Sequence, residues 1–285
     1  MVVAPAHCLR VISWNLLHGQ AIPPVPNQEW TQTLISATTQ MAANYQPDFI
    51  SIQEVDYLQP RSNNINQTKV IAENSGLKYW AYLPAIFGTP GESWKKVKNL
   101  EQSIITENSD IPESKSYGIG IATNQKIVKL SVKKLGRSII GMPLLIPKDN
   151  GKGARFIYVK DEPRVALVAQ LENGLTIATT HLSFVPGVNI FQLNRLSSFL
   201  KKLPGEKILT GDLNLPANIP SKLSGFKSLA KIPTYPSWGE KIQFDYIMAR
   251  SSSVKSGQIS ATLIENNSKL KISDHSPIGV EIRFQ

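Results

Sequence analysis

The fold of this chain is indicated most clearly by the stretch Leu209-Thr210-Gly211-Asp212-Leu213-Asn214. Its apolar start, led in by Ile208, has the form of a buried strand that meets a turn at Gly211. Asp212 and Asn214 are two residues apart, so in an extended chain both side chains point to the same face. An acid and an amide at the mouth of a sheet suit the binding of a water molecule and a phosphate oxygen. Gly, Asp and Asn also favour turns, so this stretch alone leaves both interpretations open.

Short apolar runs that predict β-strands recur along the rest of the chain. They cover residues 9–15, 49–55, 78–83, 117–123, 127–135, 165–171, 175–180, 242–248, 261–265 and 278–284. Turn residues predict two hairpins, one around Asn124-Gln125 and one at Glu172-Asn173-Gly174. Residues 84–116, 141–153 and 216–236 show no regular pattern and are expected to be irregular.

Helical spacing of apolar residues appears in three places. Asn27 is the expected N-cap of a first helix, whose buried stripe is Trp30, Leu34, Ala37, Met41 and Tyr45. A short helix is expected within residues 64–74, and a third follows Pro186-Gly187 with the stripe Leu193, Leu196, Leu200 and Leu203. Strands that alternate with helices early and late, with hairpins between them, predict an α/β fold with a mixed sheet or a pair of sheets. No linker divides the chain, so residues 1–285 are expected to form a single domain.

Composition and charge narrow the class of protein. No apolar run approaches the ~20 residues of a membrane helix, and no secretory signal precedes Arg10, so a cytoplasmic location is expected. The single Cys8 excludes an internal disulfide framework and a thiolate metal cluster, and its apolar neighbours predict a buried, inert thiol. The formal net charge of +10 attracts phosphate-rich partners, either nucleic acid or an anionic membrane surface. No protein partner is predicted.

Polar residues at or just past the ends of the predicted strands form the candidate site. They are Asn15, Glu54, His181, Asp212, Asn214, Asp245, Asp274 and His275. Open α/β sheets build their sites at the carboxyl ends of strands. Carboxylate and amide oxygens without Cys suit Mg²⁺, with Mn²⁺ as a substitute. Zinc is not expected, because the chain has four His residues and no H-x-x-x-H pair.

Six short motifs occur in the order and approximate spacing of a known family. They are Ser13-Trp14-Asn15, Gln53-Glu54, Thr180-His181-Leu182, Gly211-Asp212-Leu213-Asn214, Phe244-Asp245-Tyr246 and Ser273-Asp274-His275. With them the chain resembles the endonuclease/exonuclease/phosphatase superfamily, the deoxyribonuclease I-like metal-dependent phosphoesterases. The resemblance covers nearly the whole chain. It implies a four-layered α/β sandwich of two packed mixed β-sheets flanked by helices, and metal-dependent phosphoester hydrolysis.

The resemblance also implies a role for each motif residue. Metal binding would fall to Glu54, with Asn15 and Asp274 assisting. Among the catalytic residues, Asp212 would orient or deprotonate the attacking water, and Asn214 would hold that water or a phosphate oxygen. His275 would contact the scissile phosphate, with Asp245 orienting its imidazole. His181 would be a second phosphate contact or a proton donor. Tyr117 and Arg164 are expected near the site, in functional or structural roles, and His18 is expected to be a loop residue.

Two positions depart from the family pattern. Leu213 stands where Phe is common, which is a harmless exchange. Leu17 stands where abasic-site endonucleases carry a second carboxylate, which argues against a repair enzyme of that kind. A nuclease is the leading expectation because of the basic charge and the Lys95–Lys98 cluster. The alternatives are a phosphatase or phosphodiesterase acting on phospholipid or inositol-phosphate headgroups, and a catalytically inactive relative that only binds an anionic partner.

Overall fold

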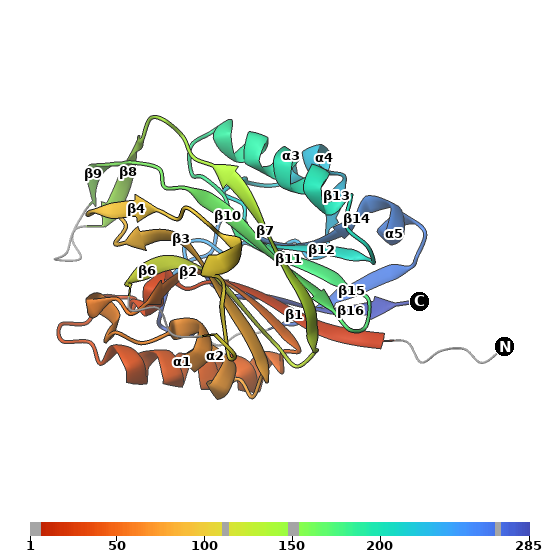
Figure 1. The fold of residues 1–285 in the computed structure, drawn as a ribbon, viewed down its shortest axis with the longest axis horizontal. Helices are drawn as coiled ribbons and strands as arrows, with labels where there is room; N and C mark the ends of the chain where they lie inside the picture. Colours follow the sequence, from red (N-terminus) through yellow and green to blue (C-terminus); the bar gives the residue numbers. More distant parts are fainter. Residues whose placement is uncertain (1–6, 110–113, 148–153, 266–268) are drawn as a thin grey trace.

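Two β-sheets packed face to face form the centre of the computed structural model, which describes residues 7–109, 114–147, 154–265 and 269–285. In Figure 1, α1 and α2 cover the outer face of one sheet and α3 and α4 the outer face of the other. This is the four-layered α/β sandwich expected from the sequence.

The first sheet has eight strands in the described residues. Its order is β15 (Ile259–Leu263), β16 (Ile278–Phe284), β1 (His7–Asn15), β2 (Phe49–Tyr57), β6 (Ser116–Thr123), β3 (Tyr79–Gly88) and β4 (Trp94–Lys96), with β5 (Ile105–Thr106) beside β3. The second sheet has the order β13 (Phe226–Ser228), β14 (Asp245–Arg250), β12 (Lys207–Asp212), β11 (Thr176–His181), β10 (Arg164–Leu171) and β7 (Ile127–Gly136). A separate hairpin consists of β8 (Met142–Pro147) and β9 (Ala154–Val159).

The helices are short apart from two. They are α1 (Trp30–Tyr45), α2 (Gln67–Asn74), α3 (Val188–Leu200), α4 (Ile219–Ser224) and α5 (Ser251–Lys255), with 3-10 turns η1 (Leu17–Gly19), η2 (Pro60–Ser62) and η3 (Glu101–Ser103). In the stripe expected on α1, Leu34, Ala37, Met41 and Tyr45 are buried against the first sheet, and Trp30 is half-buried. In the leucine stripe, Leu193, Leu196 and Leu200 are buried against the second sheet, whereas Leu203 follows the end of α3 and is half-buried. No helix among the described residues is long and apolar enough to cross a membrane.

The core lies between the two sheets and continues under both helical layers. Side chains such as Val11, Phe49, Leu167 and Ile247 fill the space between the sheets. Their strand neighbours point outward and pack under the helices, as Ile50 does beneath α1 and α2. Strands covered on both faces need apolar residues on both faces, which explains the continuous apolar runs of the sequence.

The predicted hairpin at Asn124-Gln125 is wrong, whereas that at residues 172–174 is confirmed. β6 and β7 belong to different sheets, so the chain crosses from one sheet to the other at this point. β10 and β11 do pair antiparallel. A strand that is apolar on both faces carries little information about which strand lies beside it, so sequence could not separate a hairpin from a crossing at Asn124.

Other expectations fail in detail. The segments expected to be irregular contain β4, β5, β8, β13 and α4, although residues 110–113 and 148–153 lie outside the described part of the chain. No strand was expected at β9. Asn27 does not cap α1, because the helix begins at Trp30 after Glu29, whose side chain makes no capping hydrogen bond. Cys8 is exposed rather than buried, since it lies near the start of the long strand β1.

Strand direction brings the candidate residues to one end of the sandwich. β1 and β2 run parallel, with Asn15 beside Gln53, and β11 and β12 run parallel, with His181 beside Asp212. β14 runs antiparallel to β12 and begins at Asp245, directly opposite Asp212. Asp245 is therefore the first residue of its strand. The sequence had suggested that Asp245 lies inside a strand over residues 242–248.

Gly211 makes the close approach of β12 to β11 possible. Its φ is +134°, a region that L side chains rarely adopt, and a Cβ atom at this position would collide with the Thr180 carbonyl oxygen.

We expect Gly211→Ala to lower the free energy of unfolding by ~3 kcal/mol or more, measured by denaturant titration. Gly76→Ala is the matched control, because Gly76 also has positive φ but open space around it. Equal losses in both variants would contradict a steric role for Gly211.

Candidate active site

Asn15 joins the two sheets at the site. Its Nδ2 donates to Glu54 Oε1 on β2 and to Asp212 Oδ2 on β12, both at 3.0 Å. Its Oδ1 accepts from the Leu17 backbone N–H at 3.1 Å, and its carbonyl accepts from Ser273 Oγ at 2.6 Å. Metal binding by Asn15 stays a prediction, and the hydrogen bonds show that Asn15 orients two carboxylates.

Glu54 lies on a β-bulge rather than at a strand end. The register of β2 against β6 shifts between Ile52 and Val55, and Glu54 has φ of +56°. The strand continues to Tyr57. A bulge redirects a side chain out of the pleat, so Glu54 reaches the site from the middle of a strand whose neighbouring residues stay in the core. Its carboxylate is partly exposed and therefore available to a ligand.

Asp212 is the buried acid at the centre of the group. It accepts hydrogen bonds from Asn15 Nδ2 and from the Asn214 backbone N–H at 2.9 Å. Its Oδ2 lies 3.6 Å from His181 Nε2 and 3.7 Å from His275 Nε2. Burial raises the pKa of Asp212 to about 7, against the opposing effect of His275, and the charge of Asp245 adds to the rise. Asp212 can therefore exchange a proton near neutral pH.

His275 and Asp245 form a hydrogen-bonded pair. His275 Nδ1 lies 2.7 Å from Asp245 Oδ2, which also accepts from Thr234 Oγ1 at 2.6 Å. Burial lowers the pKa of His275, but the charges of Asp245 and Asp212 outweigh it and raise the pKa well above its usual value. With Nδ1–H directed at Asp245, Nε2–H faces Asp212 and the open side of the site.

His181 differs from His275 in its charge. Burial, reinforced by Arg164 and His275, holds the pKa of His181 well below its usual value, so this imidazole is neutral. Asn214 Nδ2 lies 3.2 Å from His181 Nε2 and also donates to the Leu182 carbonyl at 3.0 Å. When Nε2 accepts from Asn214, the His181 proton is on Nδ1, which lies 3.8 Å from Glu54 Oε1. His181 thus suits a hydrogen-bonding role better than that of a proton donor.

Asp274 completes the set of acids. Burial raises its pKa to about 6, against the lowering effect of His275, and the charge of Glu54 contributes to the rise. The backbone carbonyl of Asp274 accepts from the Ser237 N–H at 2.8 Å, which fixes the loop that carries both Asp274 and His275.

The donor set fits a hard divalent cation. Glu54, Asp212 and Asp274 supply carboxylates. The pKa values of the last two are raised by burial first and by neighbouring acids second, and a bound cation would stabilise their charged forms. A second arrangement exists, since ligand atoms of Asp212, Asp245 and His275 lie within 4.8 Å of one another. His275 and Asp245 already bond to each other at 2.7 Å, so a cation in this second arrangement would compete with that bond. Metal binding by Glu54 and Asp274 stays a prediction.

Two arginines lie beside this group. Arg164 is buried and bonds Asp161 Oδ1 through Nη2 at 3.2 Å. It shares a small cavity with His181, Tyr117 and Glu162, so the two residues expected near the site are there. Arg61 was missed by sequence reasoning. The sequence signal for its position was Asp56, an acid within an apolar strand that needs a cationic partner. Arg61 is that partner and donates two hydrogen bonds of 2.8 Å to the Asp56 carboxylate.

His18 has a structural environment. Its ring stacks on Trp30 with centroids 5.7 Å apart. Burial, aided by the charge of Arg61, lowers the pKa of His18 to about 3. A neutral, stacked imidazole agrees with the loop role expected from the sequence.

Comparison with known proteins identifies the family. A model of the endonuclease/exonuclease/phosphatase family matches residues 12–275. The chain belongs to this family. Its members hydrolyse phosphoester bonds, so the protein is a phosphoester hydrolase of a family that generally uses a divalent metal. No curated protein matches the sequence.

Solved structures share the fold at low sequence identity. An endonuclease/exonuclease/phosphatase from Bacteroides vulgatus superposes with a TM-score of 0.60 at 13% identity, over 98% of this chain and 100% of that one. A mannosyl-6-phosphatase from Bacteroides thetaiotaomicron gives 0.55 at 13% identity, over 96% and 99%. The human nocturnin catalytic domain with a bound sulfate anion gives 0.55 at 16% identity, over 100% of both chains.

The His275–Asp245 pair is open to a direct kinetic test. Asp245→Asn removes the charge that raises the pKa of His275 while keeping the size of the side chain. We expect kcat on bis-p-nitrophenyl phosphate to fall by about 100-fold to 10,000-fold with little change in KM. Asp48→Asn is the control, because Asp48 accepts from the Arg10 backbone N–H outside the site. A kcat within about twofold of the wild type would show that Asp245 does not support His275.

Proton release on metal binding tests the raised pKa values. Asp212 and Asp274 titrate at about 7 and about 6 in the metal-free protein, so they carry protons below these values and must lose them to bind a cation. Mg²⁺ affinity should therefore rise from about pH 6 to about pH 8. Calorimetry in two buffers of different ionisation enthalpy should show proton release that fades towards the upper pH. Asp274→Asn should reduce the release, and pH-independent binding without proton release would contradict the assignment.

Proposed function

We propose that the protein is a metal-dependent nuclease that cleaves phosphodiester bonds by attack of a water molecule oriented by Asp212. The observation that supports a polyanionic substrate is a group of exposed basic side chains at the end of the sandwich that carries the site. This basic rim consists of Lys95, Lys96, Lys98, Lys134, Arg137 and Lys160.

Strand pairing supports a position near the site for Lys95, Lys96, Lys134 and Arg137 of the basic rim. β4, which carries Lys95 and Lys96, pairs with the last residues of β3, and these also pair with Ser116 and Tyr117 at the start of β6. On the second sheet, Gly136 at the end of β7 pairs with Arg164. Lys96, Lys134 and Arg137 line one cavity of about 230 Å³. Arg137 also lies over the Trp94 ring at 5.4 Å.

Each catalytic side chain has a task in this proposal. Glu54 and Asp274, with Asn15 in support, would hold Mg²⁺, which supplies charge neutralisation at the phosphate. Asp212 accepts the proton of the attacking water, and Asn214 fixes the position of Asp212 through its backbone N–H. Cationic His275 faces the phosphate oxygens through Nε2, while Asp245 fixes its orientation. Neutral His181 donates a further hydrogen bond.

A second candidate substrate is a phospholipid or inositol-phosphate headgroup at an anionic membrane surface. The observation that favours it is a set of exposed apolar residues at the base of the β8–β9 hairpin. Ile139 is 98% exposed, Ile140 is 66% exposed and Tyr158 is 63% exposed. The hairpin joins the sandwich next to Asp161, which accepts from the Ser138 backbone N–H at 2.6 Å. A lipid surface would cover these side chains.

A substrate panel with charge variants tests the proposal. With Mg²⁺, single-stranded RNA or DNA should be cut by the wild type, and EDTA or His275→Ala should abolish cleavage. Replacing Lys96, Lys134 and Arg137 by Ala should raise KM for the oligonucleotide and reduce the slope of log affinity against log salt by roughly 2 to 3. Alanine at Lys222, Lys227 and Lys255, which are exposed on α4, β13 and α5, is the control. It should leave KM for the oligonucleotide and the salt slope unchanged.

The panel also separates the two candidates. Phosphatidylinositol phosphates in anionic vesicles form its second arm. Cleavage of vesicle lipid but not nucleic acid, with loss of vesicle binding in Ile139→Asp, would overturn the nuclease proposal in favour of the lipid headgroup. Equal KM and equal salt slope for the two triple variants would also contradict the role of the basic rim.

A further inference from the structure

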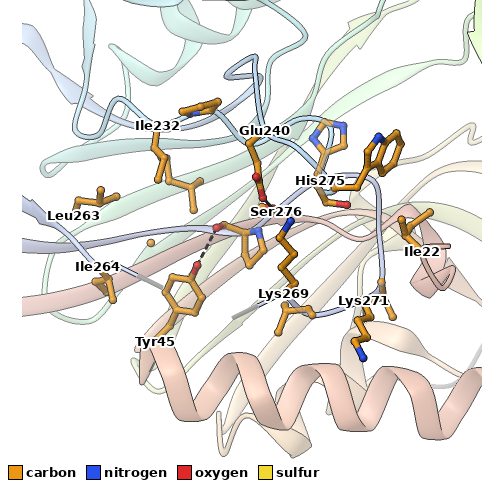
Figure 2. A pocket seen from close by; sticks show the side chains of 18 of the residues that line it. Ile22, Tyr45, Ile232, Glu240, Leu263, Ile264, Lys269, Lys271, His275 and Ser276 are labelled. Atoms are coloured by element: carbon orange, nitrogen blue, oxygen red, sulfur yellow. Dashed lines mark hydrogen bonds between the residues drawn. The ribbon is translucent and has the colours of Figure 1, made fainter. Parts of the chain in front are cut away.

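A cavity of about 630 Å³ opens beside His275 and plays no part in the reaction described above. Figure 2 shows it between the segment that carries Ile232 and Glu240, the segment of Leu263, Ile264 and Lys269, and Tyr45 at the end of α1. Its volume is within the range of small-molecule sites, roughly 300–1,000 Å³. His275 and Ser276 line it, so the cavity borders the loop that carries the catalytic histidine.

The wall of the cavity is bonded to the catalytic loop. Ser237 donates through its backbone N–H to the Asp274 carbonyl at 2.8 Å and through Oγ to the Ser273 carbonyl at 2.7 Å. Ser276 donates through Oγ to Glu240 Oε1 at 2.7 Å. The segment around Trp238 is therefore held in a fixed relation to His275, and a ligand on it would be positioned against the catalytic group.

The lining combines apolar surface with an aromatic side chain. Trp238 is 50% exposed and Ile232 is 36% exposed, although both line a concave surface next to the site. Ile22 and Pro23 line the cavity as well. Half-exposed aromatic side chains beside a phosphate-processing site are suited to stacking against the flat face of a base.

Among the polar residues that line the cavity are a cationic donor, Lys269, and an anionic acceptor, Glu240. In Figure 2 the Lys269 side chain extends across the cavity toward Ser276 and Glu240, whereas the Lys271 amine points away. Lys269 donates hydrogen bonds and Glu240 accepts them. A simple anion site would not include a carboxylate, and an aliphatic chain would use neither group. A heteroaromatic edge that carries both donors and acceptors matches the pair.

We propose that this cavity is a nucleobase site. It holds the base of the nucleotide adjoining the scissile phosphate, with the ring against Trp238 and its polar edge toward Lys269 and Glu240. The inference rests on the proposed nuclease function and specifies it, because it gives the enzyme a base-binding position on the His275 side of the site.

Binding of adenosine tests the cavity without any hydrolysis. Saturation-transfer NMR with the Mg²⁺-loaded protein should detect adenosine and not ribose. Trp238→Ala should weaken adenosine binding roughly 10-fold or more, and Lys269→Ala should weaken it about 3-fold to 10-fold. Lys271→Ala is the matched control and should bind as the wild type does. Phe191→Ala, an exposed aromatic residue on α3, controls for loss of a surface ring.

The outcomes separate this inference from the nuclease proposal. Unchanged adenosine binding in Trp238→Ala, or stronger binding of octyl phosphate than of adenosine with the same dependence on Trp238, would overturn the nucleobase site. Adenosine binding that depends on Trp238 in a protein that cuts no nucleic acid would support the site and refute the nuclease. In an active nuclease, Trp238→Ala should also raise KM for an oligonucleotide and leave KM for one with an abasic residue at that position unchanged.

Discussion

The whole site depends on one amide group, that of Asn15. Its Nδ2 is shared between a carboxylate of the first sheet and one of the second, both at 3.0 Å. Two neighbouring carboxylates repel each other unless donors lie between them, and burial makes an unpaired carboxylate such as that of Asp212 costly. The neighbouring Gln53 on β2 donates to Ser51 Oγ at 2.7 Å and to Thr179 Oγ1 at 3.0 Å. Thr179 belongs to β11, so this is a second buried polar contact between the same two sheets. The relative position of the sheets is thus fixed where the chemistry takes place.

The site keeps more negative charge buried than the fold requires. Asp245 Oδ1 is buried and makes no hydrogen bond with the described residues, and Asp212 and Asp274 have raised pKa values. Acids in this condition lower stability and are suited to binding cations and moving protons. The pKa values of the two histidines shift in opposite directions. Burial, reinforced by Arg164, lowers that of His181, whereas the charges of Asp245 and Asp212 outweigh burial and raise that of His275. One imidazole is charged and the other neutral within a single cluster.

Sequence reasoning reached the fold class because the strands are covered on both faces and their ends carry the polar residues. It placed Asn15, His181 and Asp212 correctly at strand ends. The parallel pairing of β1 with β2 and of β11 with β12 then brings these ends to the same edge of each sheet. It could not show that Glu54 lies on a bulge, since a bulge is a relation between two strands and leaves no mark in the spacing of one. It missed the crossing at Asn124 for the same reason.

The parts that were not foreseen differ in how far sequence could have reached them. Arg61 pairs with Asp56, only 5 residues away, so the buried acid was a usable local signal. The cavity beside His275 forms only where three separate segments meet, and no local pattern specifies such a meeting. The residues that carry the family motifs are local and ordered along the chain, so they could be found from the sequence, whereas the shape around them could not.

The bond from Ser273 Oγ to the Asn15 carbonyl joins residues 258 positions apart. β1, the strand that ends at Asn15, also pairs with β16, which ends at Phe284. The first sheet is therefore complete only when β16 lies beside β1, and the same pairing brings the loop of Asp274 and His275 to the Asn15 end of β1. A chain cut before residue 273 would leave one edge of β1 unpaired and would lack two residues of the site, so assembly of the site is linked to completion of the sheet.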